Sequence, residues 1–250
     1  MLYLMNLSVV LSSMVLFVVQ SSHGAEIIGG QKVPPHSMPF MALLEGMKPM
    51  CGGILISPQW VLTSARCPNI NRVLLGVDSI KSKKKEKNSR QVLKVKTQKT
   101  DKAGDLMLLK LSKPATDTET VKWLDLGRPI KEPVGGSTCK MAGWGSTNNA
   151  TQKKMSDVLM AVSVTVIDRM KCNSEYYNFK PLITKDMICA GSDHKGCQGD
   201  SGGPLLCNGA LVGVTHFVEG CGWKNFPGIY IFLSRNKLDW IKRTMKKYEI

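Results

Sequence analysis

The chain has 250 residues, enough for one large β domain or two small ones, and its hydrophobic content of 43% indicates a globular protein with a buried core rather than a disordered chain. Its formal net charge of +15 favours association with polyanions such as sulfated glycans, anionic membranes or nucleic acid. Aromatic residues make up 6% and do not alternate with the basic residues, so no specific nucleic-acid partner is expected.

Residues 1–24 form an apolar run that ends in small and polar residues, which is typical of a secretory signal peptide. A membrane anchor is the alternative, but Asn6, Ser8 and Ser12 interrupt the run and no basic stop follows it. No later segment is long and apolar enough to span a bilayer. We therefore expect a secreted protein.

Short apolar segments separated by Gly, Pro, Asn and Ser clusters predict an all-β protein. Strands are expected in the first half at CGGILIS, WVLTS, RVLLGV, QVLKVKT and DLMLLKL, and in the second half at CKMAGWG, VLMAVSVTVI, DMICAG, GPLLC and ALVGVTHFV. A polar connection at about residues 113–135 joins the halves. Asn208 and Gly209 predict a hairpin turn, because both residue types tolerate positive φ. Residues 236–248 predict the one clear helix.

The eight cysteines are an even set, which in a secreted protein indicates four disulfides. Eight cysteines allow 105 pairings, and the spacings alone do not choose among them. The chain has no CxxC pair and only four histidines, so a zinc site has little support. We expect neither a metal nor a cofactor.

The string GDSGGP at residues 199–204 is the most informative motif in the chain. Its glycines let the backbone turn sharply around Ser201 and point N–H groups at one spot, as an oxyanion hole requires. Gly199 and Ser201 would supply those N–H groups. A tight turn beside a strand is the alternative interpretation of any GxSGG, but the full string is much more specific.

With this motif the chain resembles the trypsin/chymotrypsin family of serine proteases, and the granzymes most closely, over residues 27–248. The resemblance implies two orthogonal six-stranded antiparallel β-barrels with a C-terminal helix. IIGG at residues 27–30 is similar to the mature N-terminus of the family, and residues 25–26 resemble an activation dipeptide. The freed ammonium of Ile27 would then pair with Asp200, since a buried charge must be paired to be tolerated. The family's disulfides map onto Cys51–Cys67, Cys139–Cys207, Cys172–Cys189 and Cys197–Cys221.

The catalytic triad is where the resemblance breaks down. Asp105 in DLMLLKL matches the family's aspartate, but LTSARC at residues 62–67 places Arg66 where the family has histidine. A guanidinium stays protonated at physiological pH, so Arg66 cannot act as a general base, although it can pair with Asp105. His216 stands where the family has a serine that contacts the aspartate. His216 would either serve as a substitute base for Ser201 or merely pack or pair with Asp105, and the second interpretation is favoured.

The substrate pocket of the family is also altered. Lys195 stands at the pocket floor, which would repel basic substrate side chains and favour acidic ones. Val218 replaces a glycine at the pocket entrance, next to Phe217, and Gly228 keeps the expected small residue. Trypsin-like specificity is therefore not expected.

A lysine cluster follows the third predicted strand, and it forms either a solvated face or a polyanion-binding surface. Its members are Lys81, Lys83, Lys84, Lys85 and Lys87. The basic run continues through Arg90 and returns in the tail from Lys237 onward. Asn149 begins an N-glycosylation sequon. The leading hypothesis is a catalytically silent protease homologue that binds acidic partners; the alternative is an active endopeptidase, cleaving protein or peptide substrates with non-tryptic specificity.

Overall fold

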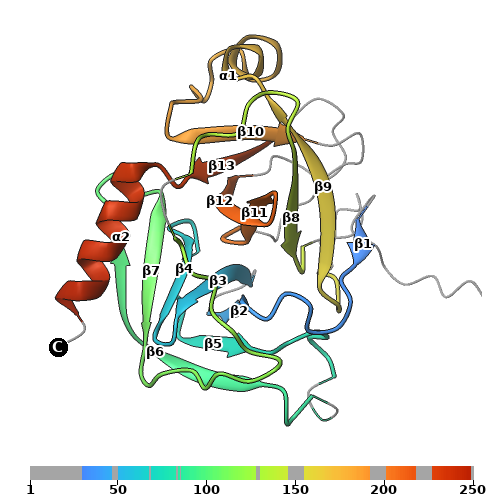
Figure 1. Cartoon of the computed structure of the whole chain (residues 1–250), viewed down its shortest axis with the longest axis vertical. Coiled ribbons are helices and arrows are strands. Elements are labelled where there is room, and N and C mark those ends of the chain that lie inside the picture. Colours follow the sequence, from blue (N-terminus) through green and yellow to red (C-terminus); the bar gives the residue numbers. More distant parts are fainter. Residues whose placement is uncertain are drawn as a thin grey trace, which may run out of the picture.

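Two closed β-barrels lie one above the other in Figure 1, and the helix α2 flanks them. The computed structural model describes residues 30–46, 50–67, 69–82, 84, 86–127, 130–145, 155–191, 201–217 and 227–248. The predicted strands all form, and the two six-stranded antiparallel barrels confirm the expected fold.

The first barrel contains six strands in the ring order β2-β3-β4-β7-β6-β5. Their bounds are β2 (Met41–Glu45), β3 (Cys51–Ser57), β4 (Trp60–Ser64), β5 (Arg72–Leu75), β6 (Gln91–Thr100) and β7 (Leu106–Leu111). The β6–β7 hairpin turns at residues 101–105, where the backbone N–H of Asp101 donates to Leu106 and that of Gly104 donates to Asp101. This turn therefore fixes Asp105 at the very start of β7.

The second barrel closes because β9 pairs with both β8 and β10, which gives the ring order β8-β9-β10-β13-β12-β11. Its strands are β8 (Thr138–Gly143), β9 (Met160–Ile167), β10 (Met187–Gly191), β11 (Pro204–Cys207), β12 (Ala210–Phe217) and β13 (Gly228–Phe232), and β1 (Gln31–Lys32) adds to β9. The predicted hairpin joins β11 to β12, with φ of 50° at Asn208 and 77° at Gly209. Strands β1, β2 and β13 were not expected from the sequence.

An apolar cluster joins both barrels to α2 (Arg235–Lys247). It contains Trp60 and Leu106 from the first barrel, Val214 from the second, and Leu238 and Ile241 from the helix, all of them buried. Burying a large apolar side chain contributes about 1.5–3 kcal/mol, so this cluster holds the helix firmly against the strands. The predicted helix is confirmed to within one residue at each end.

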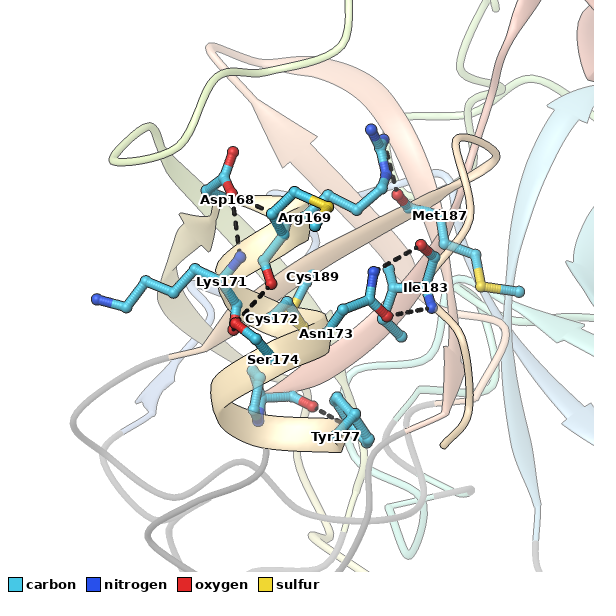
Figure 2. The surroundings of a disulfide bond; sticks show 12 residues. Asp168, Arg169, Lys171, Cys172, Asn173, Ser174, Tyr177, Ile183, Met187 and Cys189 are labelled. Atoms are coloured by element: carbon cyan, nitrogen blue, oxygen red, sulfur yellow. Dashed lines mark hydrogen bonds between the residues drawn. A yellow bond between two sulfur atoms is a disulfide. The ribbon is translucent and has the colours of Figure 1, made fainter. Parts of the chain in front are cut away.

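Three of the four expected disulfides are present: Cys51–Cys67, Cys139–Cys207 and Cys172–Cys189. Cys197 and Cys221 lie outside the described residues. Figure 2 shows the surroundings of Cys172–Cys189, which ties β10 to the short helices α1 (Arg169–Lys171) and η1 (Cys172–Tyr177).

Asp168 caps α1 by accepting the backbone N–H of Met170 at 2.9 Å and of Lys171 at 3.1 Å (Figure 2). The buried side chain of Asn173 in η1 exchanges two hydrogen bonds with the backbone of Ile183, at 3.0 and 2.7 Å. Backbone groups and a disulfide therefore stabilise this end of the second barrel, on the side away from the first barrel.

Candidate active site

The backbone around Ser201 is bound to both barrels. Its carbonyl accepts the N–H of Gly52 in β3 at 2.9 Å. The next residue, Gly202, donates to Thr215 O in β12 at 2.7 Å, and the N–H of Thr215 donates to Gly203 O at 2.8 Å. The predicted nucleophile therefore sits at the junction between the barrels.

Gly202 has a positive φ of 85° and no room for a side chain. A Cβ there would lie 2.0 Å from Thr63 Oγ1 and 2.3 Å from Gly52 O. Thr63 Oγ1 itself donates to Gly52 O at 2.8 Å, so its hydroxyl is held in place. The predicted sharp turn after Ser201 is thus enforced by contact with strands of the first barrel.

Arg66 and His216 meet across the barrel junction. Arg66 follows β4, His216 lies in β12, and Arg66 Nε donates to His216 Nε2 at 3.2 Å. The other ring nitrogen, Nδ1, lies 3.4 Å from Ser64 Oγ, which also accepts the N–H of Arg66 at 3.2 Å. A guanidinium can only donate, so Nε2 is the acceptor and Nδ1 carries the ring proton.

His216 is held in its neutral form by its surroundings. Burial lowers the pKa of His216, and the neighbouring Arg66 charge lowers it further, against a weaker opposing effect of Asp105. Among the described residues, His216 forms no hydrogen bond with Asp105 or with Ser201. Its available lone pair points at Arg66.

Asp105 is paired with a lysine from the C-terminal helix. Lys237 Nζ lies 2.7 Å from Asp105 Oδ2 and 2.5 Å from Asp101 Oδ2. The three side chains are 9% (Lys237), 16% (Asp105) and 5% (Asp101) exposed, so the cluster is mostly shielded from water. The sequence allowed Arg66 to pair with Asp105, but no salt bridge joins the two side chains among the described residues: Lys237 reaches this carboxylate from the helix, and Arg66 Nε donates to His216.

Asp101 anchors this cluster to the hairpin turn. Its Oδ1 accepts the N–H of Asp105 at 2.8 Å and of Leu106 at 3.1 Å. Burial alone would raise the pKa of Asp101, but the hydrogen bonds from Lys237 and from these two backbone groups outweigh burial and lower it. Burial likewise opposes the ammonium, yet hydrogen bonds to Asp101 and Asp105 raise the pKa of Lys237. Asp101 and Lys237 are therefore both charged at neutral pH.

The roles of Lys237 and Asp101 were not expected from the sequence. Lys237 was counted with the exposed basic tail, but it is buried. A signal was present: Lys237 lies four residues before Ile241, so both belong to the buried face of the helix. Arg90 was also counted with the exposed basic run, whereas its guanidinium pairs with Glu86 at 2.8 Å and is 6% exposed.

Two predicted pocket residues belong to the described strands. Gly228 begins β13, is buried, and has the Tyr230 ring 3.1–3.3 Å from where a Cβ would stand. Phe217 ends β12. Several other predicted site residues lie outside the described residues: Ile27, Asn149, Lys195, Gly199, Asp200 and Val218.

Lys81, Lys84 and Lys87 of the lysine cluster are exposed, and Lys83 and Lys85 lie outside the described residues. The structure gives none of the three exposed lysines a salt bridge within the part of the chain that it describes. Further exposed lysines and arginines follow on β6 and α2: Lys94, Lys96, Lys242, Arg243, Lys246 and Lys247.

Within the described ranges, no group of three or more His, Cys, Asp or Glu side chains is arranged to hold a metal ion. The described helices include none that is long and apolar enough to cross a membrane.

Comparison with known proteins relates the whole domain to one family. The model of the Trypsin family matches residues 27–241. Granzyme A of Bos taurus is 42% identical over 232 residues, which cover 88% of each chain. Kallikrein 1-related peptidase b3 of Mus musculus is 36% identical over 244 residues, covering 89% of this chain and 91% of the relative.

A solved structure gives the same result. Neuropsin, a serine protease expressed in the limbic system of mouse brain, superposes with a TM-score of 0.75 at 33% identity, covering 86% of this chain and 98% of its own. The residues matched by the family model, 27–241, include Arg66, Asp105, Ser201 and His216. The chain therefore belongs to the trypsin family of serine proteases.

Proposed function

We propose that this chain is a secreted or granule-stored homologue of the trypsin-like serine proteases that does not hydrolyse peptide bonds and acts by binding acidic partners. The observation that carries the proposal is the contact of Arg66 Nε with His216 Nε2 at 3.2 Å. The contact occupies the acceptor nitrogen of His216, which is the side chain that the sequence offers as a substitute base for Ser201.

A serine nucleophile needs a neighbouring group that accepts its proton. Arg66 remains protonated at physiological pH and has no lone pair to offer. His216 is neutral, but its acceptor nitrogen faces Arg66 and its other nitrogen carries a proton directed at Ser64. In a comparable triad, loss of the histidine lowers turnover by about 10⁶. Ser201 is thus a nucleophile without a base.

The basic surface supports the second half of the proposal. Lys81, Lys84 and Lys87 are exposed on one loop, within a chain of net charge +15. Clustered lysines without acidic partners attract sulfated glycans and other polyanions over roughly a Debye length, about 8 Å at physiological salt. The lysine cluster would therefore bind such partners by charge, with no cofactor needed.

Secretion and maturation belong to the same proposal. The apolar residues 1–24 would direct export, and the three disulfides are consistent with an oxidising compartment. Cleavage before Ile27 would free an ammonium for Asp200, and Asn149 would carry a glycan. Lys195 at the pocket floor would favour acidic substrate side chains, and Val218 would narrow the pocket entrance.

The experiment is a hydrolysis screen of the mature chain starting at Ile27. The chain is incubated with a mixed peptide library, products are identified by mass spectrometry, and Ser201→Ala serves as the matched control. The proposal predicts identical product spectra for the two proteins. Cleavage by the wild type that Ser201→Ala abolishes would instead establish the alternative, an endopeptidase using His216 or a base supplied by the substrate.

A further inference from the structure

The carboxylate of Asp105 is held by a lysine that reaches it from another part of the fold. Lys237 Nζ lies 2.7 Å from Asp105 Oδ2 and 2.5 Å from Asp101 Oδ2. Asp101 Oδ1 is already occupied by two backbone N–H groups. Among the described residues, Lys237 is the side chain that donates to Asp105.

We infer that Lys237 sequesters Asp105 from the active site, so that the chain carries a second cationic block besides Arg66. This inference rests on the proposed function, in which Ser201 lacks a base. It adds that replacing Arg66 by histidine does not rebuild the triad, because the aspartate already has a partner.

The position of the ammonium is fixed by packing. Lys237 lies in the first turn of α2, next to Leu238, which is 3% exposed. Leu238 packs in the same apolar cluster as Leu106, the residue that follows Asp105. The ion pair of Lys237 with Asp105 and the apolar cluster that contains both Leu238 and Leu106 therefore join the helix to β7 and the residue before it. This packing fixes the Lys237 backbone within reach of the Asp105 carboxylate, and the side chain is 9% exposed.

A triad aspartate works because its negative charge orients the imidazole and stabilises the imidazolium that forms. An ammonium 2.7 Å away neutralises that charge and occupies one of the two carboxylate oxygens. The charges of Asp105 and Lys237 already act in opposite directions on His216, because Asp105 raises the pKa of this imidazole and Lys237 lowers it. A histidine introduced at position 66 would thus meet an ion pair rather than a free carboxylate.

The test compares the rates at which a fluorophosphonate labels Ser201 in a set of variants, because this probe needs an activated serine but little of the substrate pocket. The first variant, Arg66→His with His216→Ser, removes the Arg66 block alone. The second adds Asp101→Asn and Lys237→Met, which remove one charge of each sign and keep an acceptor for the two backbone N–H groups. The matched controls add to the first variant either Asp101→Asn alone, which leaves Lys237 on Asp105, or Lys242→Met, an exposed lysine of the same helix.

Labelling of the second variant is expected to be about 10² times faster than that of the first. The largest increase to be expected is about 10⁴, which is the factor by which loss of the triad carboxylate lowers turnover. Both controls are expected to label at the rate of the first variant. Equal rates for the first and second variants would overturn the inference. Rapid labelling of the wild type at Ser201 would overturn the proposed function instead. The ratio of the labelling rates of the two variants would still decide the role of Lys237.

A second measurement decides the question if the variant lacking Lys237 does not fold. The pKa of the introduced histidine is measured by NMR in the first variant, where Lys237 is present. Sequestration of Asp105 predicts a pKa at or below the ordinary value of about 6.5. A free aspartate beside the imidazole would raise the pKa clearly above that value, and such a result would refute the inference.

Discussion

The substitution Lys237→Met tests how much the buried ion cluster stabilises the fold. Methionine keeps the length and apolar stem of the side chain but removes the ammonium, leaving the carboxylates of Asp101 and Asp105 without their common cation. The lysine and aspartate side chains are 9%, 5% and 16% exposed, so solvent screens them only weakly. Breaking such a buried pair costs about 3–5 kcal/mol, whereas loss of an exposed pair costs about 0–1 kcal/mol.

The assay is urea unfolding of the disulfide-intact mature chain, with the free energy of unfolding extrapolated to water. We expect Lys237→Met to lower this free energy by about 3–5 kcal/mol. Lys242→Met, which removes an exposed lysine of the same helix, should change it by no more than about 0.5 kcal/mol. Adding Asp101→Asn to Lys237→Met should recover part of the loss, because Asp105 then no longer faces a second buried negative charge.

The pH dependence follows from the two shifted pKa values. The lowered pKa of Asp101 makes its contribution present above the ordinary value of 3.8 and lost as the pH falls through the lower folded-state value. The raised pKa of Lys237 makes its contribution present below the ordinary value of 10.5 and lost as the pH rises through the higher folded-state value. The difference in unfolding free energy between wild type and Lys237→Met should therefore stay constant between these two pH limits and become smaller in acid. A loss below about 1 kcal/mol at neutral pH, equal to that of Lys242→Met, would refute the reasoning.

Three further predictions concern other parts of the site. The pKa of His216 is lowered in the folded state, so as the pH falls this histidine is protonated in the unfolded chain before it is protonated in the folded chain. Wild-type stability should therefore fall relative to that of His216→Asn as the pH drops below 6.5. Parallel curves of stability against pH would contradict this. Gly202→Ala should lower the unfolding free energy by about 2–5 kcal/mol in urea titrations, since its Cβ would lie 2.0 Å from Thr63 Oγ1 at a positive φ, and a loss below about 1 kcal/mol would show that the turn adapts. The double substitution Lys84→Ala and Lys87→Ala should lower the salt concentration that elutes the chain from immobilised heparin, and unchanged elution would place the polyanion site elsewhere.

The regular parts of the fold were predictable because they depend on local sequence. Alternating or uniformly apolar segments between turn residues gave the strands, and the positive φ values of Asn208 and Gly209 fit the hairpin expected from their residue types. The strand β2 (Met41–Glu45) was missed, although its side chains are buried in the same uniform way as those of the predicted strand β4 (Trp60–Ser64). The helices α1 and η1 contain three and six residues, too few for a helical period to show in the sequence.

The candidate site was predictable only in part. The GDSGGP motif marked Ser201, and the resemblance to the family marked Arg66 and His216, but not that these two side chains contact each other. The partner of Asp105 could not be read from local sequence because Lys237 lies 132 residues further along the chain. Composition placed Lys237 in a basic tail, whereas its register with Ile241 places it on the buried face of the helix. Periodicity was therefore the better guide to this lysine than charge.

The central claim is that Ser201 has no base, and active-site labelling of the wild type tests it most directly. The mature chain and its Ser201→Ala variant are incubated with a fluorophosphonate at neutral pH, and the bound probe is measured by intact-protein mass. The contact between Arg66 and His216 predicts that the wild type takes up no more probe than Ser201→Ala. Stoichiometric labelling of the wild type that Ser201→Ala abolishes would contradict the account.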